Sequence, residues 1–161
     1  MRFEHLVQIN DPLMPLLPTV TRGQLQRALQ LRARAPTEFM PALTACRIDS
    51  SEPTPTGAEQ YRRQLDFGNF VVRDRATLVA PDALQIDTEP GPTWPASRMT
   101  IRIEAPAETS LFLRFVYESD DTAHGELDAM TDQFRRQAYQ AADLDMVVRI
   151  RQLVEDGALG E

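Results

Sequence analysis

The sequence predicts an α+β fold in which a curved seven-stranded antiparallel sheet wraps around a long C-terminal helix, with short helices between the first and second strands. Six segments of strand character lie between residues 43 and 118 and are separated by turns, which is typical of an antiparallel meander. Residues 126–156 contain neither proline nor glycine, as expected of one long helix. The 161 residues suit a single domain, expected over 1–161.

The first strand is expected at residues 2–9. Phe3, His5, Val7 and Ile9 occupy alternate positions there, so their side chains share one face of a strand. Leu6 is an apolar exception on the other face. The strand should end before Pro12, because proline cannot donate a hydrogen bond to a sheet.

A helix is expected to begin at Thr21. Thr21 and Gln24 have the spacing of a capping box, in which each side chain satisfies a free backbone N–H of the first turn. Its modest apolar stripe includes Arg32. Pro36 should end this helix and open a short second one, which Pro41 closes.

The remaining strands are separated by turns rich in proline, glycine and aspartate. They are expected near residues 43–50, 58–67, 70–79, 83–88, 97–105 and 110–118. The inward positions of the last three strands are Leu84, Ile86, Met99, Ile101, Ile103, Leu111, Leu113, Phe115 and Tyr117.

One hairpin can be read in register. Gly68 and Asn69 between two apolar runs predict a two-residue loop that needs positive φ, so facing residues have numbers that sum to 137. Arg63 and Asp74 then face each other on the apolar side of the sheet. Two opposite charges in register indicate an ion pair, which is either a structural salt bridge or a polar anchor in a ligand cavity.

The long helix shows an apolar stripe at steps of three and four residues. Its members are Leu127, Met130, Phe134, Ala138, Ala141, Leu144, Val148 and Arg151. This stripe is predicted to face the sheet, where Met130 and Phe134 would close one end of a cavity. Gly157 is expected to stop the helix.

The composition excludes several classes of function. A net charge of −7 argues against nucleic acid and anionic membranes as partners. Cys46 is the only cysteine, so neither an intramolecular disulfide nor a thiolate metal cluster is possible. No run of about 18 apolar residues or signal-like N-terminal segment occurs, and cytoplasmic residence is expected.

No motif predicts a particular chemistry. The sequence contains no His-Glu-x-x-His, Gly-x-Ser-x-Gly or Gly-x-Gly-x-x-Gly, so no metal, cofactor or catalytic residue is assigned. Ser97, Ser110 and His5 are compatible with a catalytic triad by type, but nothing in the sequence places them together. His124 precedes the long helix and should cap it or lie in solvent.

The candidate ligand-binding residues are those predicted on the apolar side of the sheet or on the long helix. Tyr61 and Tyr117 carry hydroxyls that need partners when buried, which suits polar contacts in an apolar pocket, although plain core packing is slightly favoured for each. The full candidate set is His5, Tyr61, Arg63, Asp74, Met99, Phe115, Tyr117, Met130 and Phe134.

Several segments together resemble the AtaL-like family of bacterial and fungal proteins. They are 3–6 and 10–12, 67–69 and 72–74, 100–104, 113–115 with Tyr117, and 142–145. The family lies within the START-like, birch-pollen-allergen-like (SRPBCC) superfamily, and the resemblance implies its helix-grip fold. It also implies a deep cavity for hydrophobic or aromatic small molecules. Some members of the superfamily are cyclases, aromatases or hydrolases, and others only carry ligands.

Three hypotheses follow. The first is a protein that binds a hydrophobic small molecule in an internal apolar cavity. The second is an enzyme of polyketide-cyclase type, in which Arg63, Asp74 and His5 act together on a carbonyl substrate. The third is a homodimer or protein-interaction module, indicated by Leu6 and Val71 on faces that should be wet.

Overall fold

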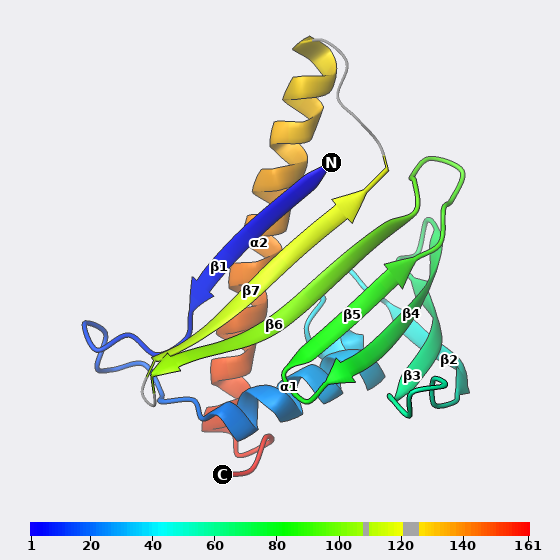
Figure 1. Cartoon of the computed structure of the whole chain (residues 1–161). Coiled ribbons are helices and arrows are strands. Elements are labelled where there is room, and N and C mark those ends of the chain that lie inside the picture. Colours follow the sequence, from blue (N-terminus) through cyan, green and yellow to red (C-terminus); the bar gives the residue numbers. More distant parts are fainter. Residues whose placement is uncertain (108–109, 121–125) are drawn as a thin grey trace.

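The computed structural model describes residues 1–107, 110–120 and 126–161, and the side chains of 126–128 are outside this description. A seven-stranded antiparallel sheet forms one layer and two helices form the other (Figure 1). The strands are β1 Arg2–Gln8, β2 Ala45–Ser51, β3 Gln60–Asp66, β4 Val71–Ala80, β5 Ala83–Thr88, β6 Ser97–Ala107 and β7 Ser110–Ser119. The helices are α1 Arg22–Arg34, a 3₁₀ turn at Pro36–Glu38 and α2 Glu126–Glu155.

The sheet order is β1-β7-β6-β5-β4-β3-β2, so each consecutive pair from β2 to β7 forms a neighbouring antiparallel pair and β1 closes the opposite edge. The predicted curved sheet and C-terminal helix are thereby confirmed. Figure 1 shows α2 crossing behind β1 and β7, while α1 lies across one end of the sheet near the C-terminal part of α2. His124 lies outside the described residues.

The ends of the helices follow the predicted signals. The Thr21 side chain accepts from the Gln24 N–H and the Gln24 side chain accepts from the Thr21 N–H, which completes the capping box. At the end of α2, the Ala158 N–H bonds to the Leu153 carbonyl and the Gly157 N–H bonds to the Val154 carbonyl. Gly157 has φ +73, so α2 ends in a Schellman motif that uses glycine's access to the left-handed region.

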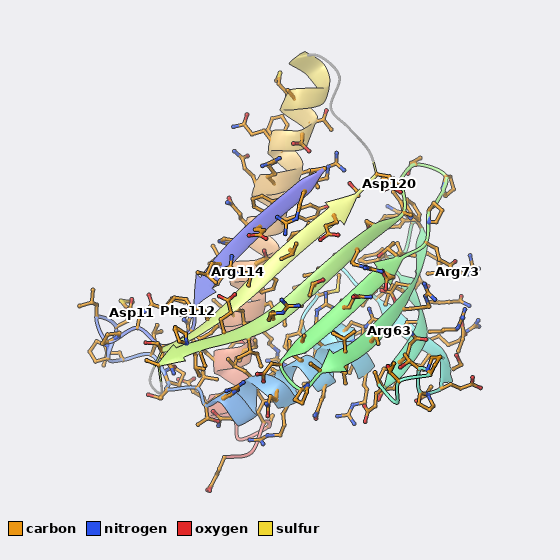
Figure 2. The ribbon with its side chains drawn as sticks, in the orientation of Figure 1. Asp11, Arg63, Arg73, Phe112, Arg114 and Asp120 are labelled. Atoms are coloured by element: carbon orange, nitrogen blue, oxygen red, sulfur yellow. The ribbon has the colours of Figure 1, made fainter. Side chains whose placement is uncertain are left out.

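The β3–β4 hairpin has the predicted register, with Arg63 opposite Asp74. Gly68 has φ +91 and the described residues other than glycine have none positive, so the turn places its positive φ at the first central position. Arg73 points outward from the hairpin (Figure 2), whereas Arg63 is 1% exposed. The alternation of strand side chains therefore carries one arginine to solvent and the other into the core.

The outer face of the sheet is wet and carries ion pairs. Arg114 projects from the face opposite α2 (Figure 2), where it bonds to Glu104 at 2.6 Å and contacts Glu4 at 3.3 Å. Leu6 and Val71 are about two-fifths exposed, as expected for apolar residues on that face. Within the described residues, no helix combines the length and apolar character needed to cross a membrane.

The apolar stripe predicted for α2 is wrong in its orientation. Met130, Phe134, Leu144 and Val148 are at least half exposed. The buried face is instead formed by Asp143, Met146, Val147, Ile150 and Leu153. Both rows have helical spacing, and the buried row contains an aspartate, so hydrophobicity alone favoured the neighbouring row. Met130 and Phe134 therefore do not close the inner side of the sheet.

The Arg63–Asp74 pair yields a prediction for stability. Both side chains are at most 1% exposed, so Asp74→Ala leaves an uncompensated buried guanidinium and should lower the free energy of unfolding by about 3–5 kcal/mol. The double variant Arg63→Met with Asp74→Leu leaves neither charge of the pair buried, so its free energy of unfolding should fall by less than that of Asp74→Ala. Urea unfolding measures both.

The control is Asp49→Ala, which removes the exposed partner of Arg47 and Gln64 and should cost far less, because water screens such surface contacts. An Asp74→Ala loss no larger than that of Asp49→Ala would contradict the burial of the pair.

Candidate functional site

A cavity of about 210 Å³ lies between the inner face of the sheet and the helices. Every strand from β3 to β7 contributes to it, together with α1, α2 and the N-terminal residue. Its apolar lining includes Met40, Leu65, Phe67, Val72, Ile86 and Met99, and its polar lining includes Arg32, Arg63, Asp74 and Tyr117. The cavity is thus an apolar space with a few polar groups, as is typical of small-molecule sites.

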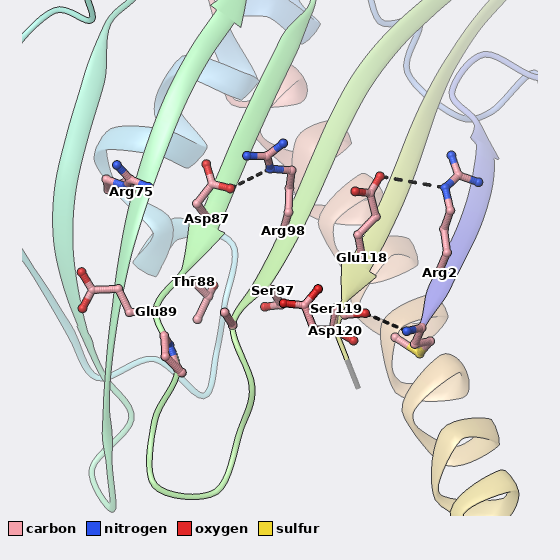
Figure 3. A pocket seen from close by; sticks show the side chains of 13 residues that line it. Arg2, Arg75, Asp87, Thr88, Glu89, Ser97, Arg98, Glu118, Ser119 and Asp120 are labelled. Carbon is pink, nitrogen blue, oxygen red and sulfur yellow. Dashed lines mark hydrogen bonds and ion pairs between the residues drawn. The ribbon is translucent and has the colours of Figure 1, made fainter. Parts of the chain in front are cut away.

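A wider depression of about 680 Å³ lies outside this cavity, at the end of the sheet where β5, β6 and β7 meet the N-terminus (Figure 3). We call it the vestibule. It shares six lining residues with the cavity: Met1, Thr88, Ser97, Arg98, Glu118 and Ser119. Its charged groups include Arg98, which donates to Asp87 at 2.7 Å, and Glu118 near Arg2 (Figure 3). Asp87, Arg98 and Glu118 face one another across neighbouring strands and alternate with the inward Ile86, Met99 and Tyr117. This part of the vestibule therefore lies on the outer face of the sheet and adjoins the cavity at the end of the strands.

Arg63 is saturated by neighbouring acceptors. Its Nε and Nη2 donate to the two carboxylate oxygens of Asp74 at 2.8 and 2.7 Å. Its Nη1 donates to the backbone carbonyls of Arg32 and Ala33 at 3.1 and 2.9 Å. Arg63 thus joins the hairpin to the last turn of α1, where a cation also interacts favourably with the helix dipole. This geometry favours the structural reading of the pair.

Arg32 differs from Arg63 in having buried donors without partners. Its Nε and Nη1 are buried and lack a hydrogen-bond acceptor within the described part of the chain. Burial, followed by repulsion from Arg63, lowers the pKa of Arg32 to about 10, while Asp74 and Asp143 act in the opposite direction. The guanidinium therefore remains protonated at neutral pH.

Asp143 of α2 contacts side chains of two neighbouring strands, β7 and β1. One carboxylate oxygen accepts from the Tyr117 hydroxyl of β7, and the other lies 3.2 Å from Nδ1 of His5 on β1. Burial raises the pKa of Asp143 to about 6, although the bonds to Tyr117 and His5 oppose this effect. Burial and the nearby Asp143 charge raise the pKa of the Tyr117 phenol.

Two stacked rings form an aromatic wall of the cavity. Tyr117 and Tyr139 have ring centroids 3.9 Å apart and planes inclined by 2°. Both residues line the cavity. Phe3 stacks against each of them at longer range, and the Arg136 guanidinium lies 5.5 Å from the Phe3 ring centroid. The wall is suited to a flat apolar ligand.

The structure brings only part of the predicted set together. Arg63, Asp74, Met99 and Tyr117 line the cavity. His5 lies behind Tyr117 as a partner of Asp143. Tyr61 and Phe115 are buried in the core, with the Tyr61 hydroxyl donating to Glu59 at 3.1 Å. Met130 and Phe134 are exposed on α2. The predicted catalytic grouping of Arg63, Asp74 and His5 does not assemble, because Arg63 and Asp74 bond to each other whereas His5 bonds to Asp143 and does not line the cavity.

The sequence analysis did not propose Arg32, Asp143 or Tyr139 as site residues. Arg32 lies in the apolar stripe predicted for α1, where a charged side chain is unexpected. Asp143 precedes Met146, Val147 and Ile150 at helical spacing, but an acidic residue lowers the apolar score of that row. Both signals are charges at buried positions, and they become meaningful only when the buried face is known.

Neither a triad nor a metal site is formed among the described residues. Ser97 lines the mouth of the cavity, whereas Ser110 lines a separate depression near Pro12 and Pro18. No group of three or more histidine, cysteine, aspartate or glutamate side chains within residues 1–107, 110–120 and 126–161 is arranged to hold a metal ion.

Comparison with known proteins identifies the family. The model of the family described as acetylaranotin biosynthesis cluster protein L (AtaL) matches residues 7–157. Among curated proteins, none matches the sequence.

Solved structures share the fold at low sequence identity. The di-domain aromatase/cyclase StfQ from the steffimycin biosynthetic pathway is similar over 98% of this chain, with a TM-score of 0.67 and 11% identity. This chain spans about half of StfQ, 51% of its length. A START superfamily protein from Mycobacterium smegmatis has a TM-score of 0.63 and 12% sequence identity, and the match covers 94% of this chain and 98% of that protein. The ZhuI aromatase/cyclase from Streptomyces sp. R1128 has a TM-score of 0.62 and 11% sequence identity, and the match covers 98% of this chain and 95% of ZhuI.

The buried carboxylate of Asp143 yields a prediction for pH titration. Its pKa of about 6 lies above the ordinary 3.8, so the folded state binds a proton that the unfolded state releases between these values. The contribution of Asp143 to stability is therefore present at about pH 4 and lost as the pH rises through 6. The carboxyl ¹³C shift of Asp143, assigned with Asp143→Asn, should titrate near pH 6.

His5→Leu removes a hydrogen bond that favours the ionised form, so it should move the midpoint higher. The internal reference is Asp82, whose pKa is held below 3.8 by Arg22. Titration of Asp143 at the pH of an exposed aspartate would show that its carboxylate is hydrated.

Proposed function

The chain belongs to the AtaL family in the START-like helix-grip superfamily, and from this premise we propose that it binds a hydrophobic or aromatic small molecule in the cavity between the sheet and the helices. The observation that carries the proposal is the composition of the cavity wall. Apolar side chains from several strands and the stacked rings of Tyr117 and Tyr139 surround a space that few polar groups enter.

The dimensions of the cavity favour a small ligand. Its volume of about 210 Å³ is below the ~300–1,000 Å³ of common ligand pockets. A one- or two-ring molecule suits this space, and a longer one would extend into the vestibule past Ser97 and Arg98. The polar vestibule then contacts the part of the ligand that remains in water.

Aromatase/cyclase activity is the alternative enzymatic function. It is the named activity of StfQ and ZhuI, whose likeness to this chain at 11% identity shows the fold alone. The residues first considered for it, Arg63 and Asp74, are fully engaged with each other and with α1. Ligand binding needs no free catalytic group, so it explains the engaged Arg63 and Asp74 more simply than catalysis does.

Self-association is a second candidate function. The exposed residues Met130, Phe134, Leu144 and Val148 on α2, with Ala141 between them, follow one another at steps of four, seven, three and four residues, so they share one face of the helix. A second copy of α2 would supply the matching row. Light scattering should then give a dimer for the wild type and a monomer for Phe134→Glu, and a wild-type monomer at high concentration would exclude it.

The binding proposal is tested by filling the cavity. Met99→Trp adds a bulky ring to the lining and should abolish the increase in melting temperature that 2-naphthamide or 2-naphthoate produces in the wild type. Differential scanning fluorimetry and calorimetric titration measure this effect.

The matched control is Met14→Trp, an equal change on an exposed loop residue remote from the cavity, which should bind as the wild type does. Wild-type protein that binds neither probe, or a Met99→Trp variant that binds both unchanged, would contradict the proposal.

A further inference from the structure

Arg32 lines the cavity and carries buried hydrogen-bond donors that lack an acceptor among the described residues. The residue is 7% exposed, and its Nε and Nη1 are buried without an acceptor in the described part of the chain. A buried donor left without a partner costs about 1–3 kcal/mol, and a charged one costs more. Folded proteins keep such a group rarely, and a bound acceptor is one way to satisfy it.

The nearby carboxylates are already engaged. Both oxygens of Asp74 accept from Arg63. The two oxygens of Asp143 bond to Tyr117 and His5. The backbone of Arg32 is itself fixed, because its carbonyl accepts from Arg63. Arg32 thus lines the cavity from a fixed backbone position, with Nε and Nη1 unpartnered in the described part of the chain.

We infer that the ligand carries a carboxylate, or an equivalent delocalised oxyanion, which the Arg32 guanidinium binds inside the cavity. This inference rests on the binding function proposed above and specifies the class of ligand. An arginine donates to such an anion through charge-assisted hydrogen bonds, which are stronger than those to a neutral carbonyl. Because Arg32 is only 7% exposed, this difference becomes a preference for the charged ligand.

The cavity also fixes the orientation of that ligand. Arg32 belongs to α1, is buried, and its carbonyl accepts from the buried Arg63, so it lies on the inner side of the cavity. The anionic end is therefore directed inward, toward α1. The flat apolar body lies against Tyr117, Tyr139, Ile86 and Met99. The ligand class is a small aromatic or apolar acid.

The test compares two probes that differ in charge and share their shape. The anion 2-naphthoate and the neutral amide 2-naphthamide are titrated into the wild-type full-length chain by calorimetry at neutral pH. Naphthoate should bind on the order of tenfold or more tightly, the magnitude of a hydrogen bond to a charged group. Arg32→Gln should remove this preference by weakening naphthoate binding while leaving naphthamide within a few-fold.

Arg32→Lys keeps the positive charge and should restore part of the preference. The matched control is Arg151→Gln. Arg151 is half-buried and, like Arg32, has an Nε without a partner among the described residues, but it donates to the Ile9 carbonyl at 3.0 Å and does not line the cavity. This control should retain the wild-type preference. Should the Arg32 variants not fold, the Nε–H resonance of Arg32 in the wild type should shift with naphthoate and stay in place with naphthamide.

The outcomes separate the two proposals. Equal affinity of the wild type for both probes, or an equal loss of both in Arg32→Gln, keeps the binding function and overturns the anion site. Binding of neither probe removes the binding function and the anion site with it. A loss in Arg151→Gln as large as that in Arg32→Gln attributes the preference to overall charge and also overturns the anion site.

Discussion

The buried contact between Arg63 and its acceptors is the constraint on which the inner side of this protein depends. The guanidinium joins Asp74 across the hairpin and the carbonyls of Arg32 and Ala33 at the end of α1. It therefore bonds the inner face of the sheet directly to that helix. Buried ion pairs contribute little net stability but fix a geometry, because their partners cannot separate without exposing a charge to an apolar medium.

A second set of polar contacts fixes the other wall of the cavity. Asp143 connects α2 to β7 through Tyr117 and to β1 through His5. The stacked Tyr117 and Tyr139 rings belong to the same connection between strand and helix. Arg32 interacts electrostatically with both polar sets. Its charge is tolerated between two acidic neighbours, but neither supplies a hydrogen bond to its buried nitrogens.

Local patterns were sufficient for most of the fold, because they report local physics. The capping box at Thr21, the positive φ at Gly68 and the stop at Gly157 each act within a few residues. The register that pairs Arg63 with Asp74 follows from one turn and the two-residue period of a strand. The predicted rotation of α2 was wrong because two rows of the helix are similarly apolar. Only contact with the sheet distinguishes the buried Val147 from the exposed Val148.

The sequence by itself determined the element order, the antiparallel meander, the hairpin register and the presence of charges on an apolar face. These features depend on neighbours in the chain, on side-chain periodicity and on turn geometry. The tertiary structure alone decided that Arg63 is saturated, that Arg32 is not, and that Asp143 reaches His5 across 138 positions of sequence. Such pairings depend on how far the sheet bends and how α2 is rotated, which are set by the packing of the whole chain.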